Sequence, residues 1–233
     1  MNIGLILAGG IGTRLGGDIP KQYMEVNGKM VISYCLAVFG MHPQIDAIQI
    51  VAHQEWHEEI RRAMPESVRA KFKGFSTPGA NRQLSIYNGL QDVMQYAAEE
   101  DIVIVHDAAR PLVSAAILSA CIEACALHDG VLPVLPMKDT VYLGDGSRIT
   151  SLLDRSSVYA GQAPEAFKLG KYYEANRRLL PDKILEINGS TEPAIMAGMD
   201  IAMIPGEESN YKITTRADLE RFKEMLHRQG GLH

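Results

Sequence analysis

The chain has 233 residues, of which 46% are hydrophobic and 22% are charged. This composition is typical of a globular protein and excludes a disordered or collagen-like chain. The 28 acidic residues outnumber the 23 lysines and arginines, so the formal net charge at pH 7 is −5. Because proteins that wrap nucleic acid carry a basic excess, we expect no nucleic-acid partner, and any anionic ligand must be bound by a few placed cations.

The start of the chain lacks the features of a targeting segment. Residues 1–13 form an uncharged run, but no basic segment precedes it and glycines interrupt it. This pattern excludes a signal peptide and a membrane span. The three cysteines, Cys35, Cys121 and Cys125, form no Cys-x-x-Cys pair, which favours buried thiols in a reducing compartment. We therefore expect a soluble, cytoplasmic protein with no membrane partner.

Short apolar runs alternate along the chain with segments of helical periodicity. Four runs rich in Ile, Leu and Val lack polar alternation, as strands buried on both faces do: residues 3–7, 48–51, 102–105 and 131–135. Helical patterns lie between them, at residues 56–64, 82–98 and 114–127, the last with Ser114 as its N-cap. This alternation predicts an α/β fold with a Rossmann-like, mostly parallel sheet and helices on both faces.

The pattern changes after Pro136. Residues 140–143 and 149–153 resemble two short strands around a Gly-Asp-Gly turn, which is typical of a hairpin. Because a two-stranded hairpin is marginally stable alone, we expect residues 138–161 to form a β-arm that packs on the second subunit of a homodimer. A helix from residue 169, a strand at 201–204 and a helix at 215–227 then complete one domain over residues 1–233.

A glycine-rich segment follows the first predicted strand directly. Residues 7–17 are LAGGIGTRLGG, and glycines at this place let backbone N–H groups approach phosphate oxygens closely. The dinucleotide fingerprint fails because Leu15 stands where its third glycine belongs. The Walker pattern fails because no Gly-Lys is followed by Ser or Thr. What remains is a phosphate-binding loop with two cations of its own, Arg14 and Lys21.

Polar residues also follow the strand predicted at 102–105. The order is His106-Asp107-Ala108-Ala109-Arg110-Pro111. Open α/β sheets bind ligands beyond the carboxyl ends of their strands, so Asp107 and Arg110 are candidate ligand-binding residues.

Several longer motifs occur in order along the chain. They are residues 7–22 (LAGGIGTRLG…PKQ), 79–90 (GANRQLSIYNGL), 105–111 (VHDAARP), Asp139-Thr140, Asp154-Arg155, 161–164 (GQAP) and 210–214 (NYKIT). Together they resemble the motifs of the cytidylyltransferases that act on small polyol phosphates. That family comprises the methylerythritol 4-phosphate and the ribitol 5-phosphate cytidylyltransferases.

The resemblance implies a nucleotidyltransferase domain that transfers CMP from CTP to a polyol phosphate and releases pyrophosphate. It implies catalytic contacts to the crowded phosphates from Arg14, Lys21 and Lys212. It implies nucleotide binding at Ala8, Gly9, Gly10, Gly12, Gly79, Ala80, Arg82 and Ser85. It implies acceptor binding at Asp107, Arg110, Thr140, Arg155 and Thr191, with Arg155 supplied by the partner subunit.

The implied reaction brings two anions together, so its catalysis is positioning and charge stabilisation, with no covalent step. We expect Mg²⁺ to bridge the CTP phosphates and thereby to offset their repulsion; the protein ligands of the metal stay undefined. A phosphate nucleophile is already ionised at pH 7, so His106 is better explained as a structural residue than as a general base.

The sequence departs from the family pattern in the acceptor half. Ala163 stands where the family has threonine, Glu165 stands where it has a glutamine, and residues 190–193 (STEP) replace a Thr-Asp-acidic run. The motif at 107–111 is of the methylerythritol type, whereas the first loop and the Gly-Gln before Ala163 resemble the ribitol type. We therefore expect 2-C-methyl-D-erythritol 4-phosphate as the acceptor, with D-ribitol 5-phosphate as the alternative.

Two interpretations of other kinds stay open. A catalytically idle protein that binds cytidine nucleotides would need only backbone contacts, and the three cations count against it. Transfer of another nucleotide, such as GMP, also fits the glycine loop, because nucleotidyltransferases share that loop.

Overall fold

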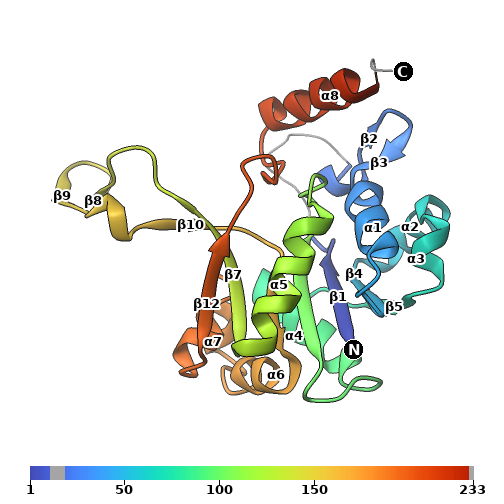
Figure 1. The fold of residues 1–233 in the computed structure, drawn as a ribbon, viewed down its shortest axis with the longest axis horizontal. Helices are drawn as coiled ribbons and strands as arrows, with labels where there is room; N and C mark the ends of the chain where they lie inside the picture. The colour runs from blue at the N-terminus through green and yellow to red at the C-terminus, as the bar shows by residue number, and fades with distance from the viewer. Residues whose placement is uncertain (11–18, 231–233) are drawn as a thin grey trace.

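A central sheet of eight strands organises the chain (Figure 1). The computed structural model describes residues 1–10 and 19–230. The strand order is β10-β7-β11-β6-β1-β4-β5, and β12 pairs with β7 as well. The bounds are β1 (Asn2–Leu7), β4 (Ala47–Val51), β5 (Phe72–Ser76), β6 (Ile102–Asp107), β7 (Gly130–Pro136), β10 (Tyr159–Gly161), β11 (Glu165–Lys168) and β12 (Ile201–Pro205).

The pairings confirm the mostly parallel sheet. Strand β1 pairs in parallel with β4 and β6, β4 with β5, and β12 with β7. Strands β10 and β11 are antiparallel to β7, and β11 is also antiparallel to β6. All four apolar runs of the sequence are strands, each extended by one or two residues. The carboxyl ends of β1, β4 and β6 therefore meet at one edge of the sheet.

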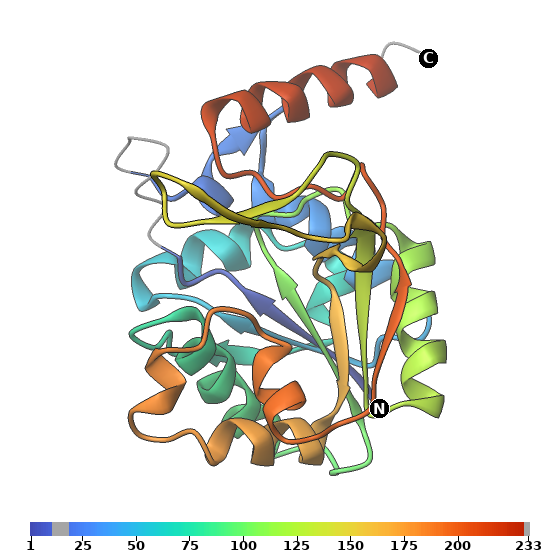
Figure 2. The ribbon, with the colours of Figure 1, turned by 90° about the vertical axis from the view of Figure 1, so that its left-hand side faces the viewer.

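Helices cover both faces of the sheet (Figures 1 and 2). The helices are α1 (Val31–Met41), α2 (His57–Ala63), α3 (Glu66–Arg69), α4 (Arg82–Val93), α5 (Ala115–Leu127), α6 (Leu169–Arg177), α7 (Glu192–Met196) and α8 (Arg216–Gly230), of which α8 lies above the sheet in Figure 1 rather than on one of its faces. Short 3-10 turns lie at η2 (Lys21–Tyr23), η3 (Gln54–Trp56), η4 (Arg155–Ser157) and η5 (Lys183–Leu185). In the described part of the chain, none of these helices combines the length and the apolar character that crossing a membrane requires.

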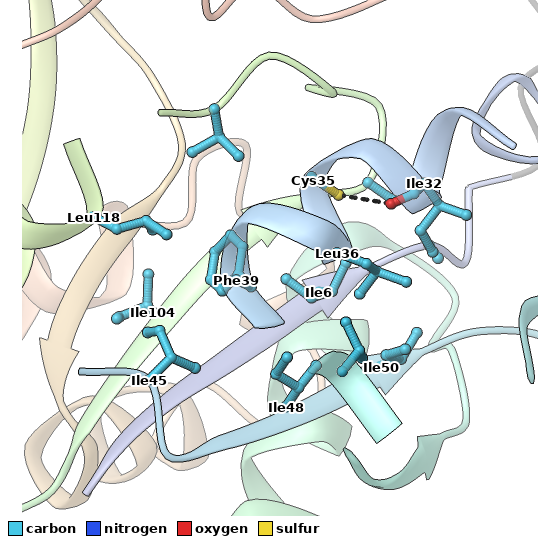
Figure 3. Packing of buried hydrophobic residues seen from close by; sticks show 14 of the residues in the cluster. Ile6, Ile32, Cys35, Leu36, Phe39, Ile45, Ile48, Ile50, Ile104 and Leu118 are labelled. Atoms are coloured by element: carbon cyan, nitrogen blue, oxygen red, sulfur yellow. Dashed lines mark hydrogen bonds between the residues drawn. The ribbon is translucent and has the colours of Figure 1, made fainter. Parts of the chain in front are cut away.

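Two hydrophobic cores explain why the strands lack polar alternation. Alternate residues of β6 point to opposite faces: Ile104 packs with α1 and α5, whereas Val103 and Val105 pack with α4 and α6. Figure 3 shows the first core, in which Leu36 and Phe39 of α1 lie against strand residues such as Ile6 and Ile48. Since both sets of side chains are buried, both must be apolar.

Side chains cap the starts of α4 and α5. The Ser114 side chain accepts a hydrogen bond from the Ile117 backbone N–H at 3.1 Å, which confirms the predicted N-cap of α5. Asn81 caps α4 in the same way, by accepting from Leu84 N–H at 2.8 Å. The predicted helix over 82–98 is too long, because α4 ends at Val93 and the chain continues in turns.

Several elements lie where the sequence pattern indicates nothing, among them α1 and β5. Helix α1 is buried around most of its circumference, so it has no polar stripe from which helical periodicity is recognised. Strand β5 is an edge strand with a register shift opposite Ile48 and Gln49, and Gly74 interrupts its apolar residues. Both follow from packing rather than from a local pattern.

The hairpin after β7 projects away from the sheet (Figure 1). Strands β8 (Tyr142–Gly144) and β9 (Ile149–Leu152) pair antiparallel, which confirms the predicted hairpin with slightly different ends. Its turn contains Gly146 at φ +93° and is held by Asp145 Oδ1, which accepts from the backbone N–H groups of Ser147 and Arg148 at 2.8 and 2.9 Å. We call residues 138–161 the arm. Its residues are mostly exposed in this chain.

Candidate active site

The carboxyl ends of the central strands open into a cavity of about 540 Å³. The residues that line it come from the ends of β1, β4 and β6, the start of α4 and the segment before α8. They are Leu7, Gly9, Gly10, Lys21, Gln22, His53, Gly79, Ala80, Asn81, Arg82, Ser85, Asp107, Ala109, Lys212 and Thr214. We call this the first cavity.

Three side chains hold the backbone after β1 by hydrogen bonds to its carbonyl oxygens. Gln22, which is 3% exposed, donates through Nε2 to the carbonyl oxygens of Ala8 and Gly10, both at 2.6 Å. Tyr23 Oη donates to the same Ala8 carbonyl at 2.8 Å, and His53 Nε2 donates to Gly9 O at 3.1 Å. Because these carbonyl oxygens accept hydrogen bonds, the backbone of this segment is fixed where it lines the cavity.

Gly9 has no room for a side chain. A Cβ built on it would lie 2.6 Å from the Cβ of Pro78, closer than nonbonded carbon atoms approach. The absent side chain lets the β1 loop contact the segment before α4, so two backbone segments distant in sequence form one wall.

The second wall is the turn that leads into α4. Ser85 Oγ accepts from the Gly79 backbone N–H at 2.9 Å and donates to the Asn81 carbonyl at 2.8 Å. Asn81 Nδ2 in turn donates to the Ile184 carbonyl at 2.9 Å. Ser85 thus fixes the turn at Gly79 and Ala80, and the residue also lines the cavity.

Asp107 lies at the centre of a cationic cluster. Its carboxylate is 3.1 Å from Arg82 Nε, 3.0 Å from Lys212 Nζ and 3.7 Å from Arg110 Nε. Burial alone would raise the pKa of Asp107, but the three cations lower it well below its ordinary range. One carboxylate among three cations leaves a local positive excess, which suits phosphate groups.

The far end of the chain reaches this cluster through backbone contacts. Ile213 N–H donates to the Ala109 carbonyl at 2.8 Å, and Arg110 Nη1 donates to the Asn210 carbonyl at 2.6 Å. These bonds join the segment before α8 to the loop after β6. Lys212 is thereby placed opposite Asp107 although it is distant from it in the sequence.

A second cavity, of about 350 Å³, adjoins the first. Arg82, Asp107 and Lys212 line both cavities. The rest of the second lining comes from the loop after β6, from β7, from residues 161–165 and from the segment before α7. These residues are Arg110, Leu132, Gly161, Ala163, Glu165, Asn188, Gly189, Ser190 and Thr191. Two ligands bound in these cavities would therefore meet at the cationic cluster.

His106 lies beneath the site and lines neither cavity. It is fully buried, and its Nε2 donates to the Arg110 carbonyl at 3.0 Å. Burial lowers the pKa of His106 to about 4, so the ring is neutral at pH 7. Its position supports the loop that carries Asp107 and Arg110.

The structure gathers most of the residues implied by the motifs. Those at the first cavity are Gly9, Gly10, Lys21, Gly79, Ala80, Arg82, Ser85, Asp107 and Lys212, and those at the second also include Arg110 and Thr191. Ala8 lines neither and is 1% exposed; its N–H donates to Val51 O, so it supports the loop. Gly12 and Arg14 lie outside the described residues.

The two arm residues do not reach either cavity of their own chain. Thr140 and Arg155 are exposed, and Arg155 Nη1 donates to the Lys138 carbonyl at 2.7 Å. Sequence reasoning gave no site role to Gln22, His53, Asn81, Thr214, Glu165 or the Asn188–Ser190 segment. Gln22 directly follows Lys21 in the first motif, and Glu165 is a departure from the family pattern, so these two carried a signal.

The described residues contain no group of three or more His, Cys, Asp or Glu side chains arranged to hold a metal ion. Asp107 and Glu165 are the carboxylates in the described lining of the two cavities, and Asp107 already contacts three cations. A divalent cation at this site would therefore take most of its ligands from phosphate oxygens and water, as Mg²⁺ does at many nucleotide sites.

Comparisons with known proteins agree on one family. The sequence model of IspD, 2-C-methyl-D-erythritol 4-phosphate cytidylyltransferase, matches residues 3–228. The 2-C-methyl-D-erythritol 4-phosphate cytidylyltransferase of Syntrophotalea carbinolica is 36% identical over 219 residues, which cover 92% of this chain and 91% of that protein. The ribitol-5-phosphate cytidylyltransferase of Lacticaseibacillus paracasei is 31% identical over 225 residues, which cover 95% and 96%.

Longer proteins match over part of their length. The bifunctional enzyme IspD/IspF of Rhodospirillum rubrum is 34% identical over 226 residues, and the match covers 97% of this chain but 57% of that protein. Among solved structures, the Francisella tularensis 2-C-methyl-D-erythritol 4-phosphate cytidylyltransferase superposes with a TM-score of 0.79 at 26% identity and covers 96% of this chain and 98% of that one. The family match includes every residue named at the two cavities.

Proposed function

Since the chain belongs to the 2-C-methyl-D-erythritol 4-phosphate cytidylyltransferase family, we propose that it transfers CMP from CTP to a small polyol phosphate. The observation that carries this proposal is the pair of cavities that share Arg82, Asp107 and Lys212. One cavity is walled by backbone after a β1 glycine segment and suits a nucleotide. The other has polar walls and suits a small hydroxylated anion.

The reaction follows from this arrangement. An oxygen of the acceptor phosphate attacks the α-phosphorus of CTP, and the bond from that phosphorus to the bridging oxygen of the β-phosphate breaks. The products are a CDP-linked polyol and pyrophosphate, and no covalent enzyme intermediate is needed. Negative charge gathers around the α-phosphate, so fixed cations that face it lower the barrier.

The described cations lie at different positions relative to the proposed sites of the phosphates. Lys21 lines the first cavity beside the glycine segment, where the triphosphate would lie. Lys212 and Arg82 border both cavities, where the two phosphates would meet. We assign Arg14 to the triphosphate as well, on the strength of its motif; it lies outside the described residues.

Cytosine recognition is assigned to the backbone walls. Gly9 and Gly10 from one segment, and Gly79 and Ala80 from the other, present main-chain groups to the first cavity. Backbone N–H and C=O groups are placed well enough to read the edge of a base when their segments are rigid. Gln22 and Ser85 supply that rigidity through their hydrogen bonds. Ala8 and Gly12 complete the assigned nucleotide loop.

In the proposed reaction, Mg²⁺ is bound to the nucleotide. Bound between phosphate oxygens, it would offset part of their repulsion and polarise the phosphorus. Because the described residues offer no carboxylate cluster, we propose that the ion arrives with CTP. The protein's own part is to hold the triphosphate with Lys21 and to place the acceptor phosphate with Arg82, Arg110 and Lys212.

For the acceptor we propose 2-C-methyl-D-erythritol 4-phosphate, with D-ribitol 5-phosphate as the second candidate. The matching family description and the Syntrophotalea relative favour the first, and the Lacticaseibacillus relative favours the second. Purified protein incubated with CTP, Mg²⁺ and each acceptor in turn should release pyrophosphate with one of them. Release with neither acceptor would contradict the proposal.

The same assay separates the other classes of function. Tight binding of cytidine nucleotides with no turnover of either acceptor would favour an idle nucleotide-binding protein. A thermal-shift comparison of CTP with GTP, ATP and UTP tests the choice of nucleotide, since a ligand that binds the folded state raises its melting temperature. We expect the largest shift with CTP.

We further propose a homodimer in which the arm crosses to the partner and places Thr140 and Arg155 at its second cavity. The arm exposes large apolar side chains, among them Tyr142 (53%), Ile149 (68%) and Leu152 (64%), and exposed apolar patches of this kind mark interaction surfaces. A dimer contact through the arm would cover them. The active site would then be shared between subunits.

Subunit mixing tests the shared site. Lys21→Ala and Arg155→Ala should each be nearly inactive alone, but a mixture re-equilibrated through the monomer should recover roughly a quarter of the wild-type activity, because each mixed dimer holds one intact site. Sedimentation should report a dimer for each variant. No recovery in exchanged dimers would show that the arm serves its own chain.

We place the protein in the cytoplasm. Cys35, Cys121 and Cys125 are all buried and unpaired, and burial raises the pKa of each thiol. Three reduced cysteines suit a reducing compartment, which is also where CTP is available.

A further inference from the structure

Glu165 brings an unexpected carboxylate into the second cavity. It is the first residue of β11 and pairs with Val105 of β6. Because β11 runs antiparallel to β6, its start lies at the sheet edge where β6 ends at Asp107. Glu165 is 7% exposed and lines the second cavity, in the part that the first cavity does not share.

Two hydroxyl groups hold this carboxylate. Ser190 Oγ donates to Glu165 Oε1, and Thr191 Oγ1 donates to Oε2 at 2.7 Å. Both residues are buried and both line the same cavity. Each hydroxyl has a single hydrogen, which it gives to the carboxylate. The three side chains therefore offer a ligand mainly acceptor lone pairs.

No cation neutralises Glu165 in the way that three cations neutralise Asp107. Within residues 1–10 and 19–230, no lysine or arginine nitrogen forms an ion pair with the Glu165 carboxylate. Burial raises the pKa of Glu165, and the nearby charge of Arg82 and the two hydroxyl donors act against that rise. A buried carboxylate that accepts one hydroxyl hydrogen bond at each oxygen and has no ion pair is costly unless a ligand supplies further donors.

We propose that Glu165, together with Ser190 and Thr191, selects the acceptor by its tail. The acceptor's phosphate lies at the cluster of Arg82, Arg110 and Lys212, where the proposed dimer also brings Arg155 of the partner subunit. The acceptor's hydroxyl groups donate to the Glu165 side of the cavity. A neutral polyol tail satisfies these acceptors, whereas a tail with a second phosphate or a carboxylate meets the negative charge of Glu165. This inference rests on the proposed function, because it concerns the acceptor half of the same site.

The lining argues against a cationic tail of the choline type. Quaternary ammonium groups offer no hydrogen-bond donor and are bound by aromatic faces. None of the described residues that line the second cavity is aromatic. The chemistry of the cavity thus favours hydroxyl groups over a trimethylammonium group.

Substitution of Glu165 by glutamine tests this selection. Glu165→Gln keeps the shape of the side chain and removes its charge. The substrates are the polyol phosphate that the wild-type enzyme uses and its matching acid, in which the terminal CH₂OH is a carboxylate, for example D-ribitol 5-phosphate and D-ribonate 5-phosphate. The wild-type enzyme should prefer the polyol, and Glu165→Gln should lower that preference in kcat/KM at least about tenfold. The KM for CTP should stay unchanged.

Glu192→Gln is the matched control. Glu192 Oε2 accepts from the Asn188 N–H at 2.9 Å and so holds the same loop from outside the second cavity. It should leave the ratio of polyol to acid unchanged. If Glu165→Gln also leaves the ratio unchanged and lowers both rates alike, Glu165 merely anchors the loop and the inference is wrong.

A binding measurement separates this inference from the proposed function. Calorimetric titration of polyol phosphate and matching acid, with a non-hydrolysable CTP analogue present, needs no turnover. Absence of turnover with every acceptor would overturn the proposed function. The ratio of the two dissociation constants would still decide the role of Glu165: a fall in Glu165→Gln supports it, and an unchanged ratio overturns it.

Discussion

The two cavities that meet at Asp107 are built from different parts of the chain. The first is walled largely by backbone, at Gly9 and Gly79, and its side chains such as Gln22 mainly hold that backbone in place. The second is lined mainly by residues with side chains, and the charged residues that it does not share with the first are Arg110 and Glu165. A backbone wall tolerates few changes, whereas a side-chain wall changes its specificity with one substitution. If the first cavity binds the nucleotide and the second the acceptor, as proposed, this difference explains why the sequence matches the family motifs at the first and departs from them at the second.

The largest effect should come from Lys21→Ala. Its role is greatest when charge builds on the α-phosphate, so we expect kcat to fall about a hundredfold while the KM for CTP changes little. Steady-state kinetics measures the two constants separately, and Lys183→Ala, an exposed lysine of η5, is the control. A change in KM alone would show that Lys21 only binds the nucleotide.

A smaller effect, confined to the first cavity, should follow Gln22→Ala. The carbonyls of Ala8 and Gly10 lose a buried donor, which should lower the free energy of unfolding by about 1–3 kcal/mol. The loosened loop should raise the Kd for CTP, while the acceptor KM stays constant. Urea denaturation and nucleotide titration measure these changes. An equal rise in the acceptor KM would contradict the separation of the two halves.

The smallest effect concerns pH and the support of the second cavity. The pKa of His106 in the folded protein, about 4, is below its value in the unfolded chain, because burial disfavours the charged ring. Its contribution to stability is therefore fully present above pH 6.5 and is lost as the pH falls toward 4. Between pH 7 and 5.5 this loss should amount to about 1 kcal/mol.

His106→Asn isolates this contribution. Denaturation of both proteins at several pH values should show that the variant loses about 1 kcal/mol less than the wild type over the same interval. The difference removes the contributions of other titrating groups. Parallel pH profiles of the two proteins would show that His106 does not titrate during unfolding.

The sequence predicts well whatever depends on local patterns. The strands at β1, β4, β6 and β7 have apolar runs because both faces of each strand are covered, and Ser114 caps α5 through its own neighbours. The motifs likewise point to Lys21 and Lys212. These features can be predicted from the sequence because each depends on residues that are close together in the chain.

Other features depend on contacts between distant segments and have no local signal. The sequence does not reveal helix α1, because the helix is buried on most sides and therefore has no polar stripe. Gln22 acts through two carbonyls on another segment, and Arg155 lines neither of the two cavities of its own chain.

The chain's sequence by itself determined the layered α/β architecture and the glycine segment. Apolar runs form buried strands, and glycines allow close backbone approach, because of properties of the residues themselves. Only the tertiary structure decided that Glu165 lines the second cavity and that Lys212 forms an ion pair with Asp107. The physical reason is the direction in which β11 runs and the packing of the C-terminal segment against the loop after β6. Strand β11 enters antiparallel beside β6, and the segment before α8 bonds to the loop after β6, so charges far apart in sequence share one buried edge.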